Sequence, residues 1–176
     1  FTTDSAAGGS ALATGERHDN RHISMSSEGE PYPSLSDFFH DKGMPVGVLT
    51  LGNVADATPT AFYGHSVERD NADELTRCLM DGRVDLLCGS GIREFTRRSD
   101  GVELISELEK QYDFVRSVDE ITARKGKVIC IDETMDDAAE QANLTLLADA
   151  TRASIAKLQE RGGKGFFLMV EGAKID

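Results

Sequence analysis

Cysteine is scarce in this chain of 176 residues. The three cysteines, Cys78, Cys88 and Cys130, are widely spaced and form no C-x-x-C pair. This spacing indicates neither a zinc knuckle nor a disulfide framework. Cys88 and Cys130 stand in apolar runs, where a thiol behaves as a small hydrophobic side chain, so we expect both to be buried.

Basic residues are also few. The chain has 19 Lys and Arg against 31 Asp and Glu, which gives a formal net charge of −12. This balance argues against a specific nucleic-acid partner, because binding a phosphate backbone requires a basic face. It would also repel a phosphate ester in solution. A phosphate site here would therefore have to be local and be formed by metal ions, an arginine or helix N-termini.

Long apolar runs and two familiar motifs are absent as well. No apolar run approaches the roughly 20 residues that a membrane helix requires, and no signal-peptide pattern opens the chain. The sequence contains no G-x-S-x-G elbow, which disfavours a serine hydrolase.

Short apolar runs that alternate with amphipathic stretches are present, in a chain long enough for one domain with a sizeable core. Four runs predict buried parallel strands, at 45–51, 84–88, 127–131 and 165–170. Three stretches predict helices, at 34–42, 101–110 and 144–161. Residues 17–33 predict an ordered surface loop. The alternation predicts an α/β fold, a three-layer sandwich around a mostly parallel central sheet.

The segment at 2–15 reads T-T-D-S-A-A-G-G-S-A-L-A-T-G and places Ser5 in the first turn of a helix. Small residues let such a helix pack closely and leave its first turn open. Unpaired backbone N–H groups and the helix dipole favour an anion there, which suits a phosphorylated serine. The alternative is a capped, alanine-rich core helix that binds nothing.

Polar residues follow a second predicted strand at 52–70. Asp56 and Thr58 flank the strand exit, and Pro59 suits the start of a new helix. Either residue could cap that helix, or their oxygens could serve a hard cation such as magnesium. Arg69 lies just beyond. It is either a solvated surface charge or a side chain that grips two phosphate oxygens.

Acidic residues also follow the last predicted strand. Glu171 comes directly after the apolar run, and Asp176 lies five residues later. Two carboxylates so placed favour a metal cluster, and a solvated loop end is the alternative.

These three segments, in this order, resemble the alkaline phosphatase family. The stretch T-D-S-A-A-G-G-S-A-L-A-T-G is similar to its nucleophile motif, and D-A-T-P-T-A-F-Y-G-H-S-V-E-R to its magnesium and arginine motif. The stretch F-F-L-M-V-E-G-A-K-I-D is similar to its later metal motif. The middle of the chain, from about residue 70 to 144, is less distinctive.

The resemblance implies a role for each matching residue. Ser5 would be the nucleophile, forming a phosphoserine intermediate while bound to one zinc. Asp4 would orient Arg69, which would clamp two oxygens of the phosphoryl group.

The resemblance also implies the metal ligands of the complete protein, which would hold two zinc ions and one magnesium ion. Thr58 and Glu171 would bind magnesium, and Asp56 would hold its water ligands. Asp176 would bind the second zinc. The family acts on small phosphate monoesters, and the resemblance further implies a homodimer in the periplasm or outside the cell.

The family pattern includes metal ligands that this sequence lacks, namely an Asp before the nucleophile strand and several His after the position of Asp176. We therefore expect residues 1–176 to be a partial catalytic domain, truncated at both ends and nearly inactive alone, with a sheet edge open to self-association. None of the four histidines (His18, His22, His40 and His65) is assigned to metal. Two alternatives stay open: another member of the metal-dependent phosphatase and sulfatase superfamily, and a non-catalytic α/β binding module.

Overall fold

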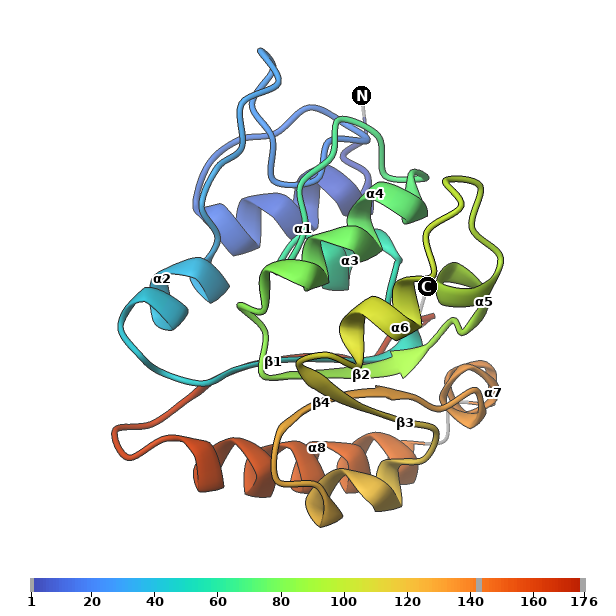
Figure 1. Cartoon of the computed structure of the whole chain (residues 1–176). Coiled ribbons are helices and arrows are strands. Elements are labelled where there is room, and N and C mark those ends of the chain that lie inside the picture. Colours follow the sequence, from blue (N-terminus) through green and yellow to red (C-terminus); the bar gives the residue numbers. More distant parts are fainter. Residues whose placement is uncertain (1, 142–143, 175–176) are drawn as a thin grey trace.

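The computed structural model describes residues 2–141 and 144–174, and a five-stranded sheet forms its centre (Figure 1). All strands are parallel, in the order β3-β4-β2-β1-β5. The strands are β1 (Val46–Asn53), β2 (Leu86–Ser90), β3 (Tyr112–Val115), β4 (Lys127–Ile131) and β5 (Phe167–Glu171). The predicted parallel sheet is confirmed.

Helices cover both faces of this sheet and produce three layers (Figure 1). The 18-residue helix α8 (Leu144–Arg161) lies along one face with the 3-10 helix η2 (Val118–Ala123). Helices α1 (Ser5–Thr14), α3 (Ala57–Thr60), α4 (Ala72–Arg77) and α6 (Leu104–Leu108) lie on the other. Strand residues alternate between the two cores, so Val48 packs on the α1 side and Leu49 on the α8 side. The predicted three-layer α/β architecture is therefore confirmed.

Two of the three predicted helices agree with the structure, and the third is shorter at both ends. Helix α2 (Leu35–Asp41) begins after Ser34, which forms a capping box with Asp37, and α8 ends at Arg161 as predicted. The helix predicted at 101–110 is only α6, Leu104–Leu108; Gly101 has φ +72°, so the predicted first residue cannot belong to an α-helix. The remaining helices are η1 (Cys78–Asp81), α5 (Arg93–Thr96) and α7 (Thr134–Glu140). None of the described helices combines the length and the apolar character needed to cross a bilayer.

The two outer strands of the described sheet differ from the sequence prediction. Strand β3 was not predicted, because its four residues Y-D-F-V include Asp113 and form no apolar run. Strand β5 was predicted to be buried, but its residues are half-buried, and Val170 is exposed. Among the described residues, β5 pairs only with β1, so one of its edges receives no strand. Cys88 and Cys130 are buried in the central strands as expected.

Parallel strands bring their carboxyl ends to the same edge of the sheet, where ligands commonly bind in such folds. Strand β1 pairs with β5 so that Thr50 lies beside Glu171. Strand β1 ends at Asn53, and helix α3 begins at Ala57. Asp56 from the second segment and Glu171 from the third therefore lie at the same edge of the sheet.

Candidate active site

Ser5 lies at the N-terminus of α1. It is the first residue of the helix and is exposed, whereas Ala6 and Ala7 behind it are buried. Asp4 is the N-cap, and its carboxylate accepts a hydrogen bond of 2.9 Å from the backbone N–H of Ala7. The alanine-rich segment thus packs one side of the helix into the core and leaves the serine in solvent at the positive end of the helix dipole.

Asp4 also joins this turn to the loop that carries Arg69. Its Oδ2 accepts a 2.9 Å hydrogen bond from the backbone N–H of Arg21 and faces Nη1 of Arg69 at 3.5 Å. Burial raises the pKa of the Asp4 carboxyl, but the backbone N–H groups of Ala7 and Arg21 and the Arg69 charge lower it more. The net result is a pKa below its ordinary value. Asp4 is therefore held as an anion between the serine helix and the arginine loop.

Close packing between α1 and α3 places Thr58 beside the serine helix. A Cβ at Gly9 would meet the Cα of Thr58 at 3.3 Å and the Cβ of Ala61 at 3.5 Å. A larger side chain at Gly9 would separate the two helices. The glycines of the first motif thus set the distance between the serine segment and the Asp56–Thr58 segment.

Asp56 and Glu171 lie near each other at the carboxyl edge of β1 and β5. Thr50 Oγ1 donates a 2.7 Å hydrogen bond to Glu171 Oε2. Gly52 lies between these groups, since a Cβ there would lie 3.2 Å from Ala173 Cβ and 3.5 Å from Asp56 Oδ2. Burial, and then the charge of Glu171, raise the pKa of the Asp56 carboxyl. Asp56 is at the N-cap position of α3 but makes no side-chain cap hydrogen bond.

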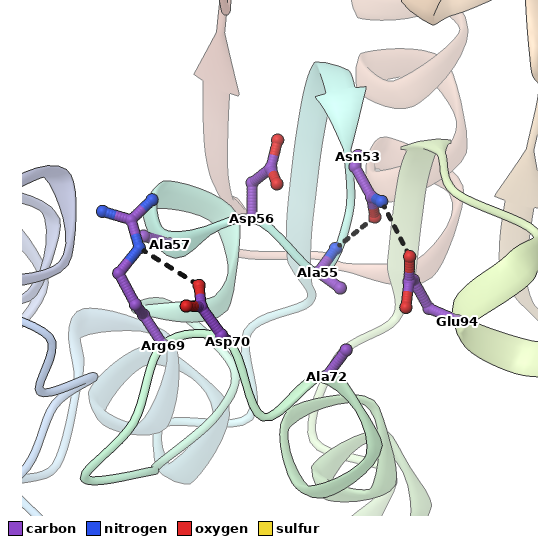
Figure 2. A pocket seen from close by; sticks show the side chains of 8 residues that line it. All are labelled: Asn53, Ala55, Asp56, Ala57, Arg69, Asp70, Ala72 and Glu94. Carbon is purple, nitrogen blue, oxygen red and sulfur yellow. Dashed lines mark hydrogen bonds and ion pairs between the residues drawn. The ribbon is translucent and has the colours of Figure 1, made fainter. Parts of the chain in front are cut away.

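A pocket of about 200 Å³ opens between the Asp56 turn and the arginine loop (Figure 2). Asp56 and Arg69 line it together, whereas Ser5, Thr58 and Glu171 do not belong to its lining. Arg69 Nε lies 3.9 Å from Asp70 Oδ1 on one side of the pocket. On the other side, Asn53 Nδ2 donates to Glu94 Oε1 at 3.2 Å.

Four polar residues at this edge, Thr50, Asn53, Asp70 and Glu94, were missed by the sequence analysis. Thr50 lies within a strand that reads as apolar, and Glu94 belongs to the less distinctive middle of the chain. Asn53 stood inside the selected segment 52–70, and its place at the end of β1 was the available signal.

Oxygen donors dominate this edge, and they suit a hard cation such as magnesium better than zinc. Asp56 and Glu171 are like charges near each other, and the pKa of the Asp56 carboxyl is raised. A cation would stabilise this arrangement. Within 2–141 and 144–174, however, no group of three or more His, Cys, Asp or Glu side chains is arranged to hold a metal ion. Asp176 lies outside the described residues.

His18 and His65 make contacts that serve local structure. His18 Nδ1 contacts the carbonyl oxygen of Met25 at 2.8 Å, and its Nε2 contacts Thr14 Oγ1 at 2.7 Å. His65 Nε2 contacts the carbonyl oxygen of Tyr32 at 2.9 Å. Of the zinc ligands implied by the family resemblance, the described residues thus contain Ser5 alone, and they do not form a zinc site.

Sequence comparison decides the family. The sequence model described as alkaline phosphatase matches residues 2–176. The chain belongs to the alkaline phosphatase family. The resemblance predicted from the three motifs is confirmed.

Two curated relatives have similar sequence identity to this chain. Alkaline phosphatase 4 of Bacillus subtilis is 31% identical over 99% of this chain and 40% of its own length. Streptomycin-6-phosphate phosphatase of Streptomyces griseus is 30% identical over 100% of this chain and 52% of its own. The chain therefore spans between 40% and 52% of the length of these relatives.

Solved alkaline phosphatases share the fold. The enzyme of the Antarctic bacterium TAB5 superposes with a TM-score of 0.88 at 24% identity, over 99% of this chain and 52% of that chain. A cold-active alkaline phosphatase from a psychrophilic Shewanella gives a TM-score of 0.87 at 28% identity, over 100% of this chain and 44% of that chain. A variant of the TAB5 enzyme is described as having Mg bound in its M3 site.

Proposed function

We propose that the whole protein hydrolyses small phosphate monoesters, with Ser5 as the phosphoryl acceptor and Arg69 as the clamp on the phosphoryl oxygens. The observation that supports this most directly is the Asp4 carboxylate, which contacts the Arg69 guanidinium and caps the helix that Ser5 begins. An exposed hydroxyl at a helix N-terminus and a planar cation are thus linked by one anchored anion. Membership in the alkaline phosphatase family supports the same reaction class.

The proposed reaction has two steps. In the first, a bond forms between Ser5 Oγ and phosphorus while the bond to the substrate alcohol breaks, and the alcohol leaves with a proton. In the second, water attacks the phosphoserine, releases inorganic phosphate and restores the hydroxyl. Arg69 holds two phosphoryl oxygens through both steps, and the free N–H groups of the first turn of α1 add positive potential.

Metal ions are part of the proposal for the complete protein. Thr58 and Glu171 would bind magnesium, with Asp56 holding its water ligands, and the raised pKa of Asp56 beside Glu171 supports a cation there. Ser5 and Asp176 would each belong to one of two zinc sites. Bound metal ions would neutralise charge that develops on the phosphoryl and leaving oxygens. The magnesium reported for the TAB5 variant agrees with a metal-dependent family.

The remaining expectations also stay proposals. We propose that residues 1–176 are part of one catalytic domain of a protein that forms a homodimer, works in the periplasm or outside the cell, and has no nucleic-acid specificity. The name of the Streptomyces relative, streptomycin-6-phosphate phosphatase, supports a monoester of a small alcohol as substrate. We expect residues 1–176 alone to be nearly inactive.

Hydrolysis of p-nitrophenyl phosphate by the full-length protein, with zinc and magnesium, tests the proposal. We expect Ser5→Ala to lower kcat by about 10³-fold or more, because the nucleophile is lost. The matched control is Ser106→Ala, at an exposed position in α6. Full activity in Ser5→Ala would contradict the nucleophile assignment. A full-length protein with neither activity nor bound metal would instead indicate a non-catalytic module.

A further inference from the structure

Arg69 is surrounded by acidic side chains that could compete with a phosphoryl group for its guanidinium. Asp4 and Asp70 face it at 3.5 and 3.9 Å, and its charge also lowers the pKa of Glu68 and opposes the rise in the pKa of Asp56. A guanidinium that closes on a carboxylate as a bidentate pair has fewer N–H groups for another anion. Arg69 can therefore offer its N–H groups to a phosphoryl group only if other groups pair with the carboxylates around it.

Arg21 occupies two of these carboxylates. Its Nε donates to Glu68 Oε2 at 2.9 Å and its Nη2 to Glu68 Oε1 at 2.5 Å, and Nη2 also pairs with Asp70. The contacts of Arg69 with its own acidic neighbours are longer, at 3.5 and 3.9 Å. Hydrogen bonding to Arg21 is also the largest cause of the low pKa of Glu68, about 2. The two residues that flank Arg69 in sequence are thus held by the other arginine.

The backbone of Arg21 supports the same arrangement. Arg21 has φ 73°, a left-handed conformation that is unfavourable for any residue with a Cβ. This conformation coincides with the hydrogen bond from the Arg21 N–H to Asp4 Oδ2, the same oxygen that faces Arg69. One strained residue therefore contacts three of the four acids around Arg69, through its backbone at Asp4 and through its side chain at Glu68 and Asp70.

We propose that Arg21 is a positioning residue for the phosphate site: by engaging Glu68 and Asp70, it leaves the Arg69 guanidinium free to bind a phosphoryl group. The inference rests on the proposed function, because it concerns the residue proposed as the phosphoryl clamp. It adds a determinant of phosphate affinity that does not itself touch the substrate.

Phosphate affinity in Arg21→Met tests the positioning role, measured in the full-length protein as the Ki of inorganic phosphate and the KM of p-nitrophenyl phosphate. We expect both constants to rise about tenfold, with a smaller change in kcat, because Glu68 and Asp70 turn to Arg69. Arg17→Met is the matched control. It makes the same charge change in the same loop, and the Arg17 side chain has no hydrogen bond or ion pair with the described residues. We expect this control to change Ki less than about twofold.

Removing the competing charges separates positioning from a merely structural role. In the triple variant Arg21→Met with Glu68→Gln and Asp70→Asn, we expect the Ki of phosphate to return to within about threefold of the wild-type value. A triple variant that binds phosphate no better than Arg21→Met would overturn the proposal. So would a crystal structure of Arg21→Met in which Arg69 keeps its place beside Asp4. Full activity in Ser5→Ala would contradict the proposed function. The Ki values of phosphate for the Arg21 variants could still be compared in that case.

Discussion

The carboxylates at the two ends of the sheet differ in burial and in charged surroundings: Asp85 at the amino end is buried, and Asp56 at the carboxyl end is exposed. At the amino end, the Asp85 carboxylate accepts a 3.0 Å hydrogen bond from the backbone N–H of Val46 and another of 3.0 Å from Arg161 Nε. Asp85 is only 8% exposed, and each of its oxygens has a donor. At the carboxyl end, Asp56 makes no side-chain cap to α3, and the charge of Glu171 raises its pKa more than the charge of Arg69 lowers it.

This difference separates charge that stabilises the fold from charge that favours a ligand. A buried carboxylate with a cation and a backbone donor ties strand to helix, here β1 to the end of α8. Two carboxylates that repel each other weaken the fold unless a cation binds. Strongly shifted pKa values commonly gather at functional sites for this reason. The contrast indicates that Asp85 stabilises the fold, and it supports the proposal that the carboxyl end binds a ligand.

Loss of Arg69 at the carboxyl end should reduce activity far more than stability. We expect Arg69→Ala to lower kcat/KM for p-nitrophenyl phosphate about 10³-fold, because the phosphoryl oxygens lose their bidentate partner. We expect the free energy of unfolding to change by less than about 0.5 kcal/mol, since the Arg69 ion pairs are long and partly exposed. Urea unfolding and steady-state kinetics of the full-length protein give both values, with the exposed Arg97→Ala as control. A large loss of stability with unchanged kinetics would reverse the assignment.

The next effect is on stability at the amino end. We expect Asp85→Ala to lower the free energy of unfolding by about 2–3 kcal/mol, because it leaves the Val46 N–H and the Arg161 guanidinium without their acceptor. Asp149→Ala is the matched control, since its ion pair with Arg152 is exposed and should contribute less than about 0.5 kcal/mol. Urea unfolding measures both. Equal effects of the two variants would show that Asp85 is not the stabilising charge we infer.

Loss of the Asp56 charge at the carboxyl end should slightly raise the free energy of unfolding. With chelator present, we expect Asp56→Asn to raise the free energy of unfolding by about 0.5 kcal/mol, because it removes the repulsion from Glu171. We also expect added magnesium to stabilise this variant less than the wild-type protein. Thermal unfolding with chelator and with magnesium measures the two differences, and Asp149→Asn controls for the change in net charge. Destabilisation of Asp56→Asn in chelator would contradict the like-charge interpretation.

The sequence predicted the inner strands and the main helices well, because these depend on local patterns. The apolar runs that became β1, β2 and β4 are each buried over nearly their whole length, and Ser34 marks the start of α2. The sequence failed at the outer strands. Burial of β5 depends on which element lies beside it, and no pattern within the strand carries that information.

The roles of the site residues stay predictions, and one contact implied by the family resemblance, between Asp4 and Arg69, is present. Ser5, Asp56, Arg69 and Glu171 were selected as motif residues with stated alternatives, and the structure places Asp56 and Arg69 in one pocket. The Ser5 and Asp4 roles remain proposals, since only the contact between Asp4 and Arg69 is observed. Arg21 carried no signal in the sequence, where it is one polar residue in a loop.

Local patterns in the sequence predicted the parallel α/β class, the start of α2 and the order of three motifs, because periodicity, caps and motifs act over a few neighbouring residues. The tertiary structure decided which charges have partners. Thr50 meets Glu171 across 121 residues, Asp85 meets Arg161 across 76, and Arg21 meets Glu68 across 47. Such pairs form only when the sheet order and the helix packing bring distant segments together. They distinguish Asp85, which has a cation and a backbone donor, from Asp56, which we propose serves a bound ligand.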